Sequence, residues 1–188
     1  MPERDLQSPT KHLDVRAFAR TKGEVGGTVA LTAFARVAAE CVDGGANAEV
    51  TWSARGQTRG GEGSLSAPWL QLHVQAVLPL ICQRCLEPVD TPVEVDQLFR
   101  FVPDEATAEQ HDDAAVEDLL VESPDFDLHE LVGDELLLAM PLIARHERCP
   151  TPPRLSAQTD GFDATAEVKP PAFAALGRLR SGSGESGE

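Results

Sequence analysis

The sequence of 188 residues contains no tyrosine, and aromatic residues make up only 5% of it. Proteins that bind single-stranded nucleic acid stack bases on aromatic side chains, so this composition argues against such a binding surface. No apolar run reaches the ~18 residues that a membrane-spanning helix needs. The N-terminal stretch MPERDLQSPTKHLD is charged and lacks the apolar segment of a secretory signal. We therefore expect a cytoplasmic protein that does not contact a membrane.

Basic residues are also scarce, because 16 Lys and Arg stand against 31 Asp and Glu and give a formal net charge of -15. Residues 101–135 hold thirteen of the acidic residues and no Lys or Arg, whereas residues 1–60 are nearly balanced. A surface of this kind repels phosphate backbones and attracts basic proteins. We expect no DNA partner, and contact with RNA only through another protein. A solvated loop that keeps the protein soluble is an equally open interpretation of residues 101–135.

The sequence motifs of several common enzyme classes are missing. The chain has no GxxxxGK[ST] loop, no GxGxxG after a predicted strand, no GxSxG and no HExxH. Asp125 and Asp127 could hold a hard cation, but their place before an apolar run is more typical of helix-capping residues. We therefore expect a protein that is not an enzyme.

Alternation of apolar and polar residues predicts three strands in the middle of the chain, at residues 48–56, 70–82 and 89–102. A shorter alternation predicts a strand at residues 12–19. Three consecutive strands of this kind indicate an antiparallel meander with one covered face, in which Pro92 requires an edge strand or a bulge.

Helical spacing of apolar residues predicts a helix over residues 28–41, after a break at Gly26 and Gly27. A second helix is predicted over residues 127–140, where Asp127 and Glu130 resemble a capping box. Residues 56–64 and 103–124 are predicted to be loops, the second with a short helix at 114–121. The expected fold class is therefore α+β, an antiparallel β-meander packed with a few helices and flanked by disordered polar tails.

We expect one folded domain with flexible ends. A short apolar helix is predicted in the C-terminal tail, at residues 170–180. This tail helix could dock in a groove of a partner or fold back onto its own domain. The expected order is a flexible N-terminus at 1–11, a single α+β domain at 12–149, a linker at 150–169, a short apolar tail helix at 170–180 and a disordered end at 181–188.

Two short stretches, ICQRCLEPV and ARHERC, contain three of the four cysteines. Cys82, Cys85, His146 and Cys149 together would form a Cys3His set, which suits tetrahedral zinc, but only tertiary folding could join pairs separated by sixty residues. Small buried cysteines are the alternative interpretation. Redox chemistry is disfavoured because no helix follows the first pair, although Arg84 could stabilise a thiolate. No cofactor other than zinc is expected.

The sequence resembles the YceD family of large ribosomal RNA subunit accumulation proteins over about residues 70–180. The residues that carry the resemblance are Cys82, Arg84, Cys85, Leu86 and Pro88 in the first motif and Asp127, Asp134, Glu135, Leu136, Leu137, Leu138, Ala139 and Pro141 in the second. The ending PAFAALGRLR is similar to the short apolar ending of many members. Some relatives carry a cysteine-rich segment where this chain has only His146 and Cys149.

The resemblance implies a role in ribosome biogenesis, through the accumulation or processing of large-subunit (23S) ribosomal RNA, and it implies no catalytic residue. We hypothesise that the acidic surface holds a basic ribosomal or assembly protein near nascent RNA. Candidate partner-binding or family-motif residues are Arg84, Leu86, Asp134, Glu135, Phe173 and Leu176.

Two other functions remain open. One is direct binding of ribosomal RNA or its metal-dependent processing, in which carboxylates of Asp125, Asp127, Asp134 and Glu135 would hold Mg²⁺. The other is a small zinc-stabilised binding module.

Overall fold

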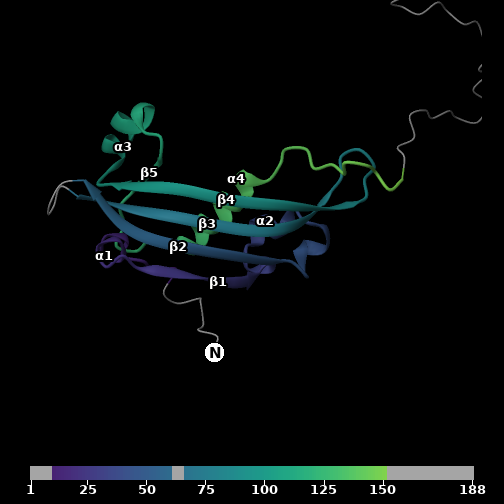
Figure 1. The fold of residues 1–188 in the computed structure, drawn as a ribbon, viewed down its shortest axis with the longest axis horizontal. Helices are drawn as coiled ribbons and strands as arrows, with labels where there is room; N and C mark the ends of the chain where they lie inside the picture. Colours follow the sequence, from purple (N-terminus) through teal and green to yellow (C-terminus); the bar gives the residue numbers. More distant parts are fainter. Residues whose placement is uncertain (1–9, 61–65, 152–188) are drawn as a thin grey trace, which may run out of the picture. The chain divides into compact units, whose positions relative to one another are not determined.

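The computed structural model describes residues 10–60 and 66–151, and its centre is a five-stranded sheet with the order β1-β2-β3-β4-β5 (Figure 1). Strands β1 to β4 are antiparallel neighbours, and β5 pairs with β4 in parallel. This arrangement confirms the predicted α+β class and meander. The strands are β1 (Glu24–Ala30), β2 (Glu49–Gly60), β3 (Ser66–Ile81), β4 (Pro88–Val102) and β5 (Asp118–Val121). The helices are α1 (Val15–Arg20), η1 (Leu31–Ala33), α2 (Ala35–Ala39), η2 (Val42–Gly45), α3 (Glu105–His111), η4 (Asp112–Ala114) and α4 (Leu128–Ala139).

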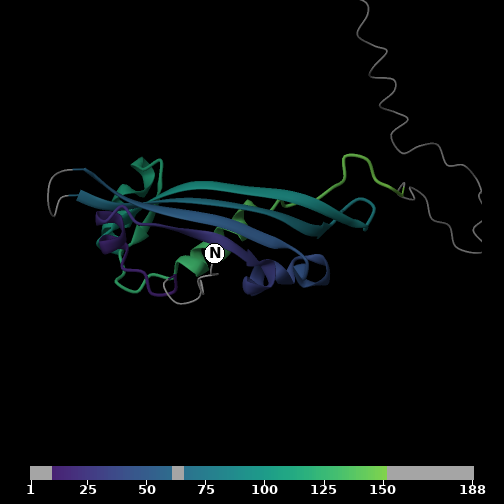
Figure 2. The same cartoon turned by 60° about the horizontal axis from the view of Figure 1, so that its bottom comes forward.

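One face of the sheet forms the hydrophobic core. The register places Trp52 opposite Val74 and Val74 opposite Val95, and all three side chains are buried. Alternation with a period of two residues sends the intervening polar side chains to the other face. Helices α2 and α4 lie on the apolar side (Figure 2), where α4 contacts β3, β4 and α2. Polar side chains of the opposite face, such as Arg55, Gln75 and Glu94, are exposed.

Helix α4 forms as the sequence predicts. The Asp127 side chain accepts a hydrogen bond of 2.9 Å from the Glu130 backbone N–H and caps the first turn. Leu128, Val132 and Leu136 recur every four residues and are fully buried. Burial of each such side chain contributes roughly 1.5–3 kcal/mol, so this stripe holds the helix on the sheet.

The predicted strand at residues 12–19 is wrong, because most of this segment forms α1. Leu13 makes only an isolated bridge to Phe126. The Asp14 side chain then caps α1 by accepting a hydrogen bond of 2.8 Å from the Ala17 N–H. The apolar residues of this segment alternate, as in a strand, but two of them also lie four residues apart, as in a helix. The side-chain cap favours the helix.

The predicted helix at residues 28–41 is largely wrong. Thr28 to Ala30 belong to the edge strand β1, and the chain then forms η1 and the five-residue α2. The apolar residues that suggested a helix are buried, but Phe34 leaves helical geometry with φ -106° and ψ 79°. Gly26 does not break the chain, because it lies within β1, where a Cβ atom would stand 2.5 Å from the Trp52 carbonyl oxygen.

The acidic segment is more structured than predicted. The expected helix at 114–121 is wrong, because Asp118–Val121 form β5 beside Phe99–Val102 of β4, and α3 and η4 precede it. The loop predicted at 56–64 is partly wrong, since β2 continues to Gly60. Pro92 lies in the part of β4 that has only β3 as a neighbour, which is the edge position that the sequence requires.

The predicted tail helix at 170–180, with Phe173 and Leu176, lies outside the described residues, as does the linker beyond Thr151. These parts of the layout stay predictions. Among the described residues, no helix combines the length and the apolar composition that crossing a membrane requires.

Candidate functional site

The turn between β3 and β4 is folded by its own backbone. The Cys82 N–H donates to the Glu87 carbonyl at 3.0 Å, and the Leu86 N–H donates to the Cys82 carbonyl at 2.9 Å. Leu86 closes the turn in the left-handed region, with φ 64°. This tight turn brings the Cys82 and Cys85 thiols to one side, with Cys82 fully buried.

The segment that follows α4 returns to this turn. The Gln83 N–H donates to the Ala144 carbonyl at 2.9 Å, which fixes the two backbones beside each other. As a result, one ligand atom from each of the four predicted residues, Cys82, Cys85, His146 and Cys149, lies within 4.8 Å of all the others. The fold therefore joins the two pairs that are sixty residues apart in sequence.

The spacing of the donor atoms suits a tetrahedral metal. Cys82 Sγ lies 3.9 Å from Cys149 Sγ, and Cys85 Sγ lies 3.4 Å from His146 Nδ1. Zinc with bonds of about 2.3 Å to sulfur and about 2.0 Å to nitrogen gives tetrahedral edges of roughly 3.8 Å and 3.5 Å. Three thiolates and one imidazole are also the donor types that zinc prefers. This Cys/His group could therefore bind zinc.

The thiols of the Cys/His group differ in their affinity for protons. Burial raises the pKa of the Cys82 thiol, but hydrogen bonds from three backbone N–H groups, led by that of Cys85, and from the His146 ring outweigh burial and lower this pKa to about 5. Burial, reinforced by the neighbouring thiols, raises the pKa of Cys85 to about 11. Metal binding at neutral pH would then release the Cys85 proton.

Arg84 lies between the two halves of the Cys/His group. Its Nε donates to Cys149 Sγ at 2.9 Å. Its Nη2 donates to the carbonyls of His146 at 2.8 Å and Glu147 at 3.2 Å. The hydrogen bond to the Cys149 sulfur, followed by electrostatic attraction to that residue, raises the pKa of Arg84. The sequence suggested Arg84 as a partner-binding or family-motif residue; Arg84 is exposed, and its Nε and Nη2 donate to groups of the same chain.

Among the described residues, no hydrogen bond or ion pair links the carboxylates of α4 to the Cys/His group. Asp134 forms an ion pair with Arg36. Glu135 is partly buried, and burial followed by the charges of Asp118 and Asp134 raises its pKa. The carboxylates suggested for Mg²⁺ thus have separate neighbours, since Asp125 pairs with His12 and Asp127 caps α4.

A second surface feature lies on α3 and η4, which project from one end of the sheet (Figure 1). We call this feature the acidic knob and define it as Asp104, Glu105, Glu109, Asp112 and Asp113, all of which are exposed. Neither helix has a buried residue. Hydrogen bonds from the Thr107 hydroxyl and backbone N–H lower the pKa of Asp104, which caps α3. Within the described ranges, no ion pair neutralises these carboxylates.

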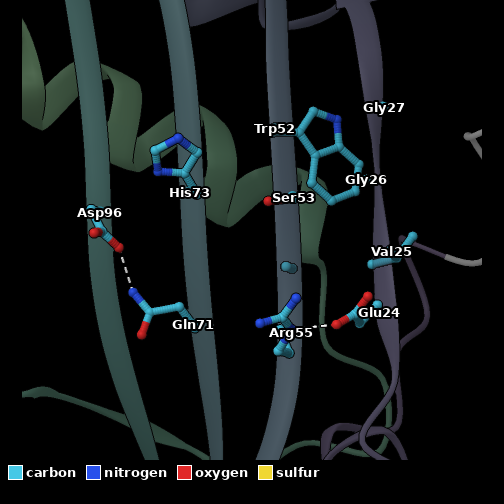
Figure 3. A pocket seen from close by; sticks show the side chains of 11 residues that line it. Glu24, Val25, Gly26, Gly27, Trp52, Ser53, Arg55, Gln71, His73 and Asp96 are labelled. Atoms are coloured by element: carbon cyan, nitrogen blue, oxygen red, sulfur yellow. Dashed lines mark hydrogen bonds and ion pairs between the residues drawn. The ribbon is translucent and has the colours of Figure 1, made fainter.

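The open face of the sheet carries a shallow hollow of about 780 Å³. Figure 3 shows that its polar and charged side chains pair across neighbouring strands, with Arg55 directed to Glu24 and Gln71 to Asp96. His73 lies 4.0 Å from Glu94. Because these groups satisfy one another, the hollow offers few free polar groups to a ligand.

Sequence reasoning nominated the four possible metal ligands but missed the contacts that join them. The hydrogen bond between Gln83 and Ala144 uses only backbone atoms, so no residue type signals it. The contact between Arg84 and Cys149 had a partial signal, because an arginine within a CxxC pair can stabilise a thiolate. The sequence indicated the acidic knob only through its high local content of Asp and Glu.

Comparison with known proteins gives a family match. A family model described as "Large ribosomal RNA subunit accumulation protein YceD" matches residues 70–180. This range includes the Cys/His group, the acidic knob and α4. No curated protein and no solved structure matches the chain.

Proposed function

Because the chain belongs to the YceD family, we propose that it is a non-catalytic ribosome-biogenesis factor that promotes the accumulation and processing of large-subunit ribosomal RNA. The proposed place of action is the cytoplasm, where ribosomal subunits are assembled. The proposed mode of action is contact with a basic ribosomal or assembly protein.

The acidic knob is the observation that carries this mode of action. It presents five exposed carboxylates within residues 104–113, and the structured part of the chain supplies them with no ion-pair partner. Carboxylates at this density repel an RNA backbone and speed the encounter with a positively charged protein. The knob could shield a basic protein from wrong phosphates until the correct RNA displaces it.

Two further parts of the chain support contact with a partner. Leu86 leaves 73% of its surface exposed although it belongs to the family motif. Glu135 occupies a position on α4 where burial and nearby like charges disfavour the ionised form of its carboxyl group. We assign partner contacts to Leu86, Asp134 and Glu135, and on sequence grounds to Phe173 and Leu176.

The proposed role of the Cys/His group is structural. Zinc held by Cys82, Cys85, His146 and Cys149 would supply a cross-link between the β3–β4 turn and the segment after α4. A closed four-ligand set of this kind stabilises a fold and leaves no position for a substrate. The group would thus fix the position of Leu86 for partner binding.

Affinity capture from growing cells tests the proposed function, with proteins and RNA both identified. We expect basic ribosomal or assembly proteins at low salt and their release at high salt, because exposed charges are screened beyond about 8 Å at physiological ionic strength. A variant with E105Q, E109Q, D112N and D113N should lose them, while Asp104 remains to cap α3.

The matched control neutralises four exposed carboxylates elsewhere, through E40Q, D43N, E49Q and D90N. This control has the same net charge as the knob variant and should keep the partners. Equal loss in both variants would indicate net charge rather than the acidic knob. Partners that stay bound at high salt, or that are mainly acidic, would contradict the proposal.

A further inference from the structure

The Arg84 guanidinium joins the β3–β4 turn to the segment carrying His146 and Cys149 through three hydrogen bonds. Its Nε donates to the Cys149 sulfur at 2.9 Å. Its Nη2 reaches the carbonyls of His146 and Glu147 at 2.8 Å and 3.2 Å. The guanidinium therefore holds one ligand atom and the backbone on which both ligands of that segment lie.

We propose that Arg84 is a positioning residue for the metal, which places Cys149 and His146 opposite the turn cysteines before zinc arrives. This inference rests on the proposed zinc site. It assigns Arg84 a role in metal binding, because Nε and Nη2 already donate to the segment that carries Cys149 and His146.

The shape of the side chain explains why an arginine suits this task. A guanidinium presents its donors in a planar fork, so its Nε and Nη2 can bind a sulfur and a carbonyl at fixed relative positions. A lysine ammonium carries the same charge as a point, without that fork. Partners of a ligand atom commonly change metal affinity by about 10–100-fold when they are removed.

A second arginine beside the Cys/His group allows the effect of positive charge on metal binding to be measured apart from the effect of hydrogen bonding. Arg148 is adjacent to Cys149 and exposed, and its side chain makes no hydrogen bond or ion pair with the described residues. Substitution of Arg84 or Arg148 by glutamine removes one positive charge near the same sulfur. Only the first substitution removes the donated hydrogen bonds.

The test measures Zn²⁺ affinity of the purified full chain by competition with a chromogenic chelator, and Co²⁺ absorption as the spectroscopic readout. We expect R84Q to bind Zn²⁺ about 10–100-fold more weakly than the wild type. R148Q should stay within about threefold of the wild type, and R84K should lie between R84Q and the wild type. Cobalt bound to R84Q should lose thiolate charge-transfer intensity because Cys149 is misplaced, whereas cobalt bound to R148Q should keep it.

The outcomes distinguish the two proposals. R84Q with the affinity and cobalt spectrum of R148Q would overturn the role of Arg84 and leave the zinc site intact. A wild-type chain that binds less than one Zn²⁺ per molecule would overturn the zinc site itself, and with it the role of Arg84. Thermal unfolding of R84Q in chelator checks that the sheet is retained, and R84K supplies a second variant if R84Q does not fold.

Discussion

Leu86 offers a direct separation of fold stability from partner binding, through the substitution Leu86→Gly. Leu86 has φ 64°, a left-handed conformation that is disfavoured by roughly 1–2 kcal/mol for a residue with a Cβ atom. Glycine adopts this conformation without strain. The substitution therefore relieves strain in the folded state while deleting the side chain.

The opposing contributions are of similar size. Because 73% of Leu86 is exposed, only about a quarter of the 1.5–3 kcal/mol for a fully buried leucine is lost, or roughly 0.4–0.8 kcal/mol. The greater freedom of glycine in the unfolded chain contributes about a further 0.4–1 kcal/mol of destabilisation. The sum predicts an unfolding free energy within about 1 kcal/mol of the wild type, measured by urea denaturation.

Partner capture should respond differently from stability. Leu86→Gly keeps the backbone N–H that donates to Cys82, so Zn²⁺ affinity should be unchanged. Recovery of the partners in affinity capture should fall, because the exposed aliphatic side chain is gone. A stability loss above about 2 kcal/mol would show that Leu86 is structural. Undiminished capture by the stable variant would show that Leu86 does not contact the partner.

Helix α4 yields two further predictions. Because the pKa of Glu135 is raised in the folded state, its contribution to stability is present at acidic pH and is lost as pH rises through that raised pKa. E135Q should therefore unfold at a higher temperature than the wild type at pH 7, and the difference should vanish at acidic pH; a lower Tm at pH 7 would contradict this reasoning. L136A should lower the unfolding free energy in urea by about 2–5 kcal/mol, because Leu136 is fully buried. Its control on the same helix, L138A, should change the unfolding free energy by less than about 0.5 kcal/mol because Leu138 is 78% exposed, and equal effects would refute the assigned helix face.

The elements that sequence predicted correctly are those in which several signals agree. β2, β3 and β4 alternate over long runs, and α4 combines a side-chain cap with an apolar stripe. The errors lie in short segments that fit two periods. Val15 and Ala19 are four residues apart but also alternate with Ala17, and β5 has only four residues, so its pairing with β4 decides its structure.

The candidate site was predictable in composition but not in assembly. Cysteine and histidine spacing identified the four residues of the Cys/His group, because zinc accepts few ligand types. Nothing in the spacing could show that the segment after α4 returns to the β3–β4 turn, since a backbone hydrogen bond from Gln83 to Ala144 joins them. The spacing also could not show the hydrogen bond from Arg84 to Cys149, which only tertiary structure brings about.

The most direct test of the proposed anionic docking role is a titration of the purified chain with large-subunit ribosomal RNA and, separately, with purified basic large-subunit ribosomal proteins, each at two salt concentrations. We expect weak RNA binding at both concentrations, and binding of at least one basic protein that weakens with salt and disappears when the acidic knob is neutralised. Tight RNA binding with a steep salt dependence, unaffected by the knob substitutions, would contradict this role and favour direct recognition of RNA.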